Sequence, residues 1–216
     1  MDKAEVLQRI RSTGLIPVIR ARSADEANAA VDAIQAGGVG VLEITMTVPG
    51  AVELIQEVAA RATEAVVGAG TVLDPETAVR CIDAGAQFIL SPALNLATIA
   101  TCRDRGVAII PGALTPTEVV AAWNAGADLV KVFPAGAVGG PSYLKALKAP
   151  LPQIDLVPTG GVNLETAGDF IRAGAAALGV GSDLVDLAAL RRGEGRLLTQ
   201  RARRFVEIVN EARQAS

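Results

Sequence analysis

The sequence contains no histidine among its 216 residues. Without an imidazole there can be no Ser–His or Cys–His nucleophile pair, and no zinc site built on His₃, His₂Glu or Cys₂His₂ ligands. Any proton transfer near neutral pH must therefore use Glu, Asp, Lys, Tyr or Cys with a shifted pKa.

The sequence also has few cysteines, no long apolar run and little net charge, and these features restrict where the protein is expected to work and what it is expected to bind. The two cysteines, Cys81 and Cys102, both fall in stretches expected to be helical, so a disulfide framework is not expected. The charged N-terminal segment does not resemble a signal peptide, and no apolar run reaches the ~18–20 residues that span a membrane. A net charge of −3 argues against a broad nucleic-acid surface. We expect a soluble cytoplasmic protein.

Half of the residues are apolar, and they follow a regular alternation. Short runs rich in Val and Ile alternate with Ala-rich amphipathic stretches of about ten to fifteen residues. Near-continuous apolar runs are typical of parallel strands that are buried on both faces. Eight such runs are predicted as strands: 15–20, 39–45, 65–68, 86–90, 107–110, 128–133, 154–158 and 176–180.

The stretches between these runs carry signals for helix ends. Ser23 with Glu26 predicts a capping box, and Asp74-Pro75 places proline at the first helical position. Thr115-Pro116-Thr117-Glu118 combines both devices. Glycine occupies the expected left-handed C-cap after five stretches, at Gly37-Gly38, Gly85, Gly106, Gly126 and Gly174.

Eight strands alternating with helices predict an α/β fold, a single TIM-barrel domain of the (β/α)₈ kind over residues 1–216. A helix at about 2–13 is expected to cap the bottom of the barrel, with a short helix at 184–190 and a closing helix at 191–215. The competing fold is an open doubly wound sheet. That fold usually shows G-x-G-x-x-G after its first strand, whereas Arg20-Ala21-Arg22-Ser23 has no glycine.

Lys131 is one of four lysines, and it lies inside the apolar run 129–133. In this fold the active site forms at the C-terminal ends of the strands. Burial would lower the pKa of this lysine, and a neutral amine is a nucleophile toward carbonyls. The alternative is a salt-bridged lysine at a strand end whose side chain reaches outward to water.

Glu43 is likewise the one charged residue in the apolar run 41–45. It lies on the second predicted strand and Lys131 on the sixth, and alternate strands of such a barrel contribute to the same interior layer. We therefore expect the two to meet as acid/base and nucleophile. The alternative is a buried ion pair that has no chemistry.

Glycine-rich turns follow the last two predicted strands. Gly160-Gly161 follows the seventh, and Gly181-Ser182 follows the eighth, where it is expected to begin the short helix. In these barrels such loops often bind phosphate through backbone N–H groups and the helix dipole. Arg20 ends the first strand and could hold a carboxylate, or could be an ordinary surface arginine.

These residues together resemble the 2-keto-3-deoxy-6-phosphogluconate aldolases, which are often grouped with the 4-hydroxy-2-oxoglutarate aldolases. The resemblance runs from about residue 5 to 212. The matching segments are Val18-Ile19-Arg20, Leu42-Glu43-Ile44-Thr45, Val67-Gly68-Ala69-Gly70-Thr71-Val72, Ser91-Pro92, Pro111-Gly112, Lys131-Val132-Phe133-Pro134-Ala135, Pro158-Thr159-Gly160-Gly161-Val162 and Gly179-Val180-Gly181-Ser182.

The resemblance implies a class I aldolase without metal or other cofactor, acting on small 2-keto acids, and a homotrimer. It assigns the Schiff-base lysine to Lys131 and the acid/base to Glu43. Pyruvate contacts fall on Thr71 and Pro92, with Phe133 beside the lysine. Phosphate contacts fall on Gly160, Gly161 and Ser182, in the turn that also holds Gly181, with Thr159 lining the site.

One position departs from the family pattern. Many members carry arginine four residues after the glutamate, where it helps to hold the substrate carboxylate, but this chain has Thr47 there. Arg20 is our expected substitute.

The sequence leaves several functions open. The first is cleavage of 2-keto-3-deoxy-6-phosphogluconate to pyruvate and glyceraldehyde 3-phosphate, with 4-hydroxy-2-oxoglutarate as a further substrate. The others are a 2-keto-3-deoxy-6-phosphogalactonate aldolase, a phosphosugar isomerase or epimerase on the same barrel, and a non-catalytic assembly subunit.

Overall fold

The computed structural model describes residues 1–215, and it has an α/β fold built on parallel strands. The strands within these residues are β1 (Leu15–Ile19), β2 (Val41–Thr45), β3 (Val66–Gly70), β4 (Phe88–Leu90), β5 (Ala108–Ile110), β6 (Gly112–Ala113), β7 (Val130–Val132), β8 (Leu156–Pro158) and β9 (Leu178–Val180). Each of the eight predicted runs overlaps one of them, and β6 is an addition that the sequence did not predict.

The strands belong to two sheets. One has the order β5-β4-β3-β2-β1-β9 and the other β6-β7-β8. Parallel bridges Leu156–Ala175 and Thr159–Gly179 link β8 to β9, and the Asp128 N–H donates to the Ile109 carbonyl at the other junction. Pro111 separates β5 from β6, because proline has no N–H to donate to a ladder.

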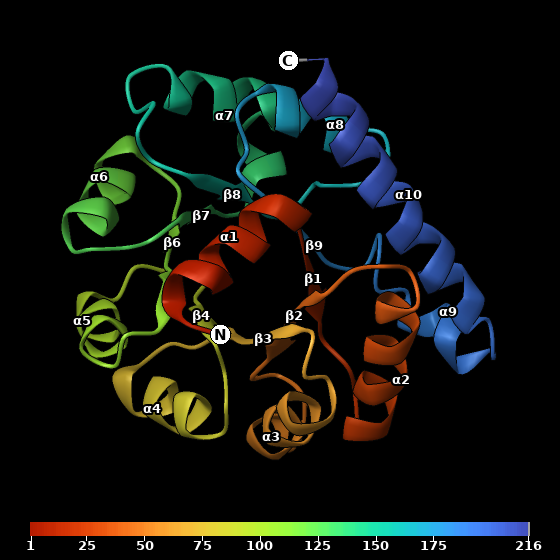
Figure 1. Ribbon diagram of the computed structural model, residues 1–216. Helices are drawn as coiled ribbons and strands as arrows, with labels where there is room; N and C mark the ends of the chain where they lie inside the picture. Colours follow the sequence, from red (N-terminus) through yellow and green to blue (C-terminus); the bar gives the residue numbers. More distant parts are fainter. Residues whose placement is uncertain (216) are drawn as a thin grey trace.

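The helices surround the strands, except for α1, which lies over the middle of the strands in this view (Figure 1). Their bounds are α1 Lys3–Thr13, α2 Ala24–Gln35, α3 Ala51–Arg61, α4 Pro75–Asp83, α5 Leu96–Asp104, α6 Pro116–Asn124, α7 Pro141–Lys148, α8 Ala167–Arg172, α9 Leu187–Arg191 and α10 Gly195–Gln214, with a 3₁₀ turn η1 at Ala135–Val138. No helix within residues 1–215 is both long and apolar enough to cross a membrane.

The predicted helix caps are confirmed with one correction. The side chains of Ser23, Asp74 and Thr115 accept hydrogen bonds from the first turns of α2, α4 and α6. The capping box at Ser23 is wrong in its second half, because the Glu26 carboxylate accepts from the Arg22 N–H at 2.7 Å and pairs with Arg191 instead.

The C-terminal helices differ from the prediction. The short helix begins at Leu187 rather than at 184, since residues 182–184 form a hydrogen-bonded turn in which the Val185 N–H donates to the Gly181 carbonyl. The long helix begins at Gly195 rather than at 191, because Gly193 adopts a left-handed φ of +79° that breaks the helix.

Two apolar clusters lie on opposite sides of the strands. The larger joins the outer faces of the strands to the surrounding helices. The smaller, which we call the inner cluster, is made of Val6, Ile10, Ile16, Val41, Val66, Phe88, Leu90, Ala108, Ile110, Leu129, Val157 and Ala177. Because α1 contributes Val6 and Ile10, it packs on the inner faces of the strands.

This packing gives a prediction for stability. Ile10 is fully buried, so Ile10→Ala should lower the free energy of unfolding by about 2–5 kcal/mol through lost burial and a cavity. Gln8→Ala on the exposed face of α1 is the matched control, with an expected change within about 0.5 kcal/mol. Urea denaturation measures both, and equal effects would contradict the packing of α1 on the inner cluster.

Candidate active site

Glu43 and Lys131 lie on the inner side of the strands. Val41 and Leu129 belong to the inner cluster, and side chains two residues apart in a strand point to the same face. Glu43 and Lys131 therefore share that face, one layer closer to the C-terminal ends of β2 and β7. Their exposed fractions are 0% and 2%. The alternative in which Lys131 reaches outward to water is wrong.

The Glu43 carboxylate sits in an unusual environment for a charged group. Both of its oxygens are buried and lack a hydrogen-bond partner among the described residues. Burial raises the pKa of this carboxyl above its ordinary value, and the charges of Lys131 and Arg20 oppose the rise. A raised pKa brings a carboxyl closer to the pH at which it can both donate and accept a proton.

Lys131 experiences the complementary effect. Burial lowers the pKa of its ammonium, the Glu43 carboxylate opposes that change, and Arg20 adds to it. Its Nζ lies 5.1 Å from the centre of the Phe133 ring. The lysine is therefore placed to react as a neutral amine, with an acid/base group on the same face of the strands.

A cavity of about 120 Å³ lies at the C-terminal ends of the strands, and it is lined by Phe133, whose ring centre is 5.1 Å from the Lys131 Nζ. It brings together seven residues that the sequence predicted for the site. These are Arg20, Phe133, Thr159, Gly160, Gly161, Gly181 and Ser182, and the remaining lining residues are Val162, Gly179 and Asp183. Residues from the ends of β1, β7, β8 and β9 thus converge on one small space.

Gly160 and Gly161 are required by their backbone conformation and by the close contact of this turn with the loop after β7. Both residues have left-handed φ angles, +83° and +78°. The Gly136 N–H donates to the Gly160 carbonyl at 2.8 Å, and a Cβ on Gly161 would lie 2.7 Å from the Gly136 Cα. The left-handed φ therefore requires glycine at 160, and at 161 the loop after β7 can dock against this turn only because that residue also has no side chain.

Thr159 points to the same inner face as Val157 of the inner cluster. Its Oγ1 is buried without a hydrogen-bond partner among residues 1–215, and it fills the space above Gly179. A buried unpaired hydroxyl costs free energy, so this atom is available to a bound molecule.

Five predicted site residues do not line the 120 Å³ cavity, namely the buried pair Glu43 and Lys131 and also Thr47, Thr71 and Pro92. Thr71 and Pro92 are half-buried beyond β3 and β4. Thr71 has a left-handed φ of +59°, which is strained for a β-branched residue and is typical of functional sites. Thr47 is exposed, and its hydroxyl lies 2.6 Å from that of Thr45, which also bonds the Ile19 carbonyl.

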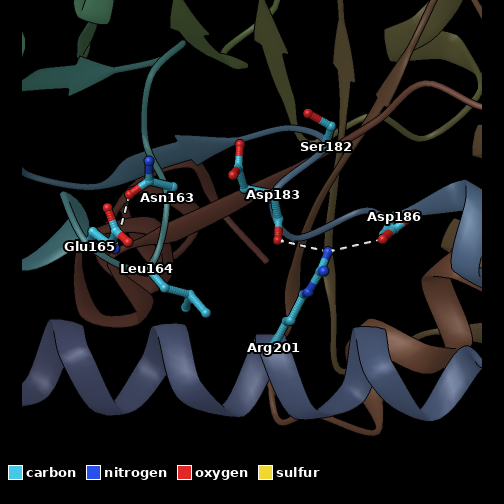
Figure 2. A pocket seen from close by; sticks show the side chains of 7 residues that line it. All are labelled: Asn163, Leu164, Glu165, Ser182, Asp183, Asp186 and Arg201. Carbon is cyan, nitrogen blue, oxygen red and sulfur yellow. Dashed lines mark hydrogen bonds and ion pairs between the residues drawn. The ribbon is translucent and has the colours of Figure 1, made fainter.

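A second cavity of about 470 Å³ adjoins the first and shares Ser182 and Asp183 with it (Figure 2). Arg201 of α10 donates to the Asp183 carbonyl at 3.2 Å and to the Asp186 carboxylate at 3.3 Å. This contact braces the turn that holds Ser182. Sequence reasoning missed Arg201, since no local pattern links it to residues 181–186.

The Ser182 turn differs from the prediction in one respect. The expected short helix begins at Leu187 with Asp186 as its N-cap, so Gly181-Ser182 does not form a helix N-terminus. Any anion at this turn would be bound by N–H and hydroxyl groups of the turn itself.

Removing either of the two charges near Lys131 should shift the pKa of this lysine, in opposite directions. Glu43→Gln should lower the Lys131 pKa below that of wild type, because the carboxylate raises it, whereas Arg20→Met should raise this pKa, because the guanidinium lowers it. The neutral form of an amine predominates only above its pKa, so the neutral fraction at a given pH rises in the first variant and falls in the second.

Carbon-13 NMR titration of the lysine Cε signals measures this pKa directly, and four lysines make assignment simple. Arg22→Met, which removes an exposed neighbouring cation, is the control and should leave the Lys131 pKa unchanged. Shifts of the same sign in the Glu43 and Arg20 variants would contradict this electrostatic arrangement.

Known proteins show which family this chain belongs to. The family model for KDPG and KHG aldolase matches residues 6–200. The chain is 36% identical to the KHG/KDPG aldolase of Escherichia coli K12 over 93% of this chain and 94% of that protein. It is 38% identical to the 2-dehydro-3-deoxy-6-phosphogalactonate aldolase of the same strain, over 92% and 95%.

A solved structure also matches closely. The KDPG aldolase of Legionella pneumophila, with pyruvate captured as a covalent carbinolamine intermediate, aligns with a TM-score of 0.85 and 29% identity over 92% of this chain and 96% of that chain. On the family model and these relatives, the chain belongs to the KDPG and KHG aldolase family.

Proposed function

We propose that this protein is a class I aldolase that cleaves 2-keto-3-deoxy-6-phosphogluconate to pyruvate and glyceraldehyde 3-phosphate. The observation that carries the proposal is a lysine and a glutamate buried on one inner face, with a glycine-lined cavity that Phe133 connects to the lysine. The E. coli and Legionella relatives support the same activity. In this proposal the reaction needs no metal or other cofactor.

The reaction begins at Lys131. Its neutral Nζ adds to the C2 carbonyl of the substrate and forms a carbinolamine, and loss of water gives an iminium. Glu43 carries the protons for this dehydration. Because burial lowers the pKa of Lys131, a larger fraction of this amine is neutral than in an exposed lysine, which favours attack.

Carbon–carbon cleavage follows from the iminium. Glu43 takes the proton of the C4 hydroxyl, the C3–C4 bond breaks, and its electron pair moves toward the iminium nitrogen to give an enamine. Glyceraldehyde 3-phosphate leaves. Protonation at C3 and hydrolysis then release pyruvate and regenerate Lys131. Glu43 must be ionised for some steps and protonated for others, which suits its raised pKa.

The two ends of the substrate are assigned to different groups. Gly160, Gly161, Gly181 and Ser182 bind the phosphate in the 120 Å³ cavity, with the Thr159 hydroxyl beside it. Phe133, Thr71 and Pro92 contact the pyruvate portion. Arg20 holds the carboxylate in place of the arginine that many family members carry at position 47, because its charge acts on both Lys131 and Glu43 at the carbonyl end of the substrate.

A second substrate has support from one specific observation. The chain is 38% identical to the E. coli phosphogalactonate aldolase, so the C4 epimer, 2-keto-3-deoxy-6-phosphogalactonate, is the second candidate. Short unphosphorylated 4-hydroxy-2-oxoglutarate is a further substrate of the same chemistry.

We further propose that the strands form one closed (β/α)₈ barrel, capped by α1, and that the chain is one domain. The bridges between β8 and β9 and the hydrogen bond from Asp128 to Ile109 support closure at both sheet junctions. The Val6 and Ile10 side chains in the inner cluster support the cap.

The proposed assembly is a homotrimer in the cytoplasm. Leu73 and Leu96 are 55% and 57% exposed, and the side-chain amide of Asn95, which precedes α5, donates to the Leu73 carbonyl, so these leucine side chains are available for contact between copies. The free, buried Cys81 and Cys102 are consistent with a reducing compartment.

The first test of this function is covalent trapping. Pyruvate with borohydride should give a stable reduced adduct on Lys131, located by peptide mass spectrometry. Lys131→Ala should lose the adduct and lower turnover at least about 100-fold on the phosphogluconate, phosphogalactonate and 4-hydroxy-2-oxoglutarate substrates. Lys145→Ala on the exposed side of α7 is the control. Near wild-type turnover by Lys131→Ala would overturn the assignment.

The second test addresses the phosphate end. Ser182→Asp places a negative charge in the cavity and should raise KM for a phosphorylated substrate at least about tenfold by like-charge repulsion. KM for the same substrate without its phosphate, 2-keto-3-deoxygluconate, whose C6 end is an uncharged hydroxyl, should change less than about twofold, as should both values for the exposed control Ser12→Asp. An equal rise for both kinds of substrate would exclude Ser182 from the phosphate site.

A further inference from the structure

Two glycines of β3 lie on the inner face of the strands. Gly68 and Gly70 share the side of Val66, which belongs to the inner cluster, and they pair in register with Glu43 and Thr45 of β2. Both are buried, and neither has a left-handed φ. Their backbone conformation would therefore accept any residue, so the neighbours must explain what excludes a side chain here.

The neighbours of the two positions differ. A Cβ on Gly70 would lie 1.9 Å from Oε1 of Glu43, 2.5 Å from its Cδ and 2.6 Å from its Cγ. A Cβ on Gly68 would instead meet the Phe88 ring at 2.3–2.4 Å. The Glu43 carboxylate thus occupies the volume that a side chain at position 70 would fill.

Hydrogen bonding does not explain this position of the carboxylate. Neither oxygen of Glu43 has a hydrogen-bond partner among the described residues. The charges of Lys131 and Arg20 attract the carboxylate, and the bare backbone of Gly70 provides the space in which it lies.

We propose that Gly70 is a positioning residue for Glu43, whose carboxylate reaches its place on the inner face that it shares with Lys131 only because Gly70 has no side chain. The inference rests on the proposed aldolase function and deepens it. A methyl group at position 70 displaces the carboxylate from the path of proton transfer, while Lys131 and the 120 Å³ cavity keep their surroundings.

The test compares Gly70→Ala with Gly68→Ala. Both variants add one methyl group to the inner face of the same strand, but only the first meets Glu43. We expect Gly70→Ala to lower kcat at least about tenfold, a part of the roughly 10²–10⁴-fold that acid–base catalysis contributes, with KM within about threefold of wild type. Its pH profile of kcat should also change shape, because the displaced carboxyl titrates in a different environment.

Gly68→Ala should keep the pH profile of wild type when activity is expressed per folded molecule. Folded fractions come from thermal denaturation of each variant. A wild-type kcat and pH profile in Gly70→Ala, or the same altered profile in Gly68→Ala, would overturn the positioning role.

A stability cycle covers the case in which Gly70→Ala does not fold. Glu43→Ala removes the side chain that the new methyl group meets, so the double variant Gly70→Ala/Glu43→Ala should melt no lower than Glu43→Ala alone. If Gly70→Ala lowers the melting temperature equally in wild type and in Glu43→Ala, the new methyl group does not clash with Glu43 and the inference fails.

Trapping separates this inference from the proposed function. If wild type forms no reduced pyruvate adduct on Lys131, the aldolase mechanism fails. If wild type and Gly70→Ala both form the adduct but their kcat values agree, only the role of Gly70 fails.

Discussion

The burial of two opposite charges in an apolar interior is the constraint on which this structure depends. Glu43 and Lys131 lie almost without exposure on the inner face of the strands. Water is removed from both, which moves the pKa values of the two groups toward each other and toward neutrality. The same desolvation that would be costly in an ordinary core makes a nucleophilic amine and a proton carrier.

The interior accommodates these groups because several strand positions have no side chain. Gly70 leaves room for the Glu43 carboxylate, and Gly179 leaves room for the hydroxyl of Thr159. Gly68 likewise leaves room for the ring of Phe88. Small residues are therefore as important as the polar ones, since protein interiors are close-packed and offer no spare volume.

Local features of the sequence predicted most of the elements. Caps at Ser23, Asp74 and Thr115 form as expected, because such bonds involve residues three or four apart. The exceptions have distant causes or weak signals. Glu26 pairs with Arg191, 165 positions away, rather than completing its capping box. The two-residue strand β6 follows a proline and has no periodicity that could mark it.

Composition and pattern alone determined that this chain has no imidazole chemistry, that its strands are parallel, and that Lys131 and Glu43 are charges in apolar strands. Tertiary structure decided which glycines stand against which side chains, that Arg201 braces the Ser182 turn, and that Thr47 stays exposed. The reason is that strand pattern and burial tendency are properties of neighbours along the chain. Excluded volume and charge proximity instead join residues that only folding brings together.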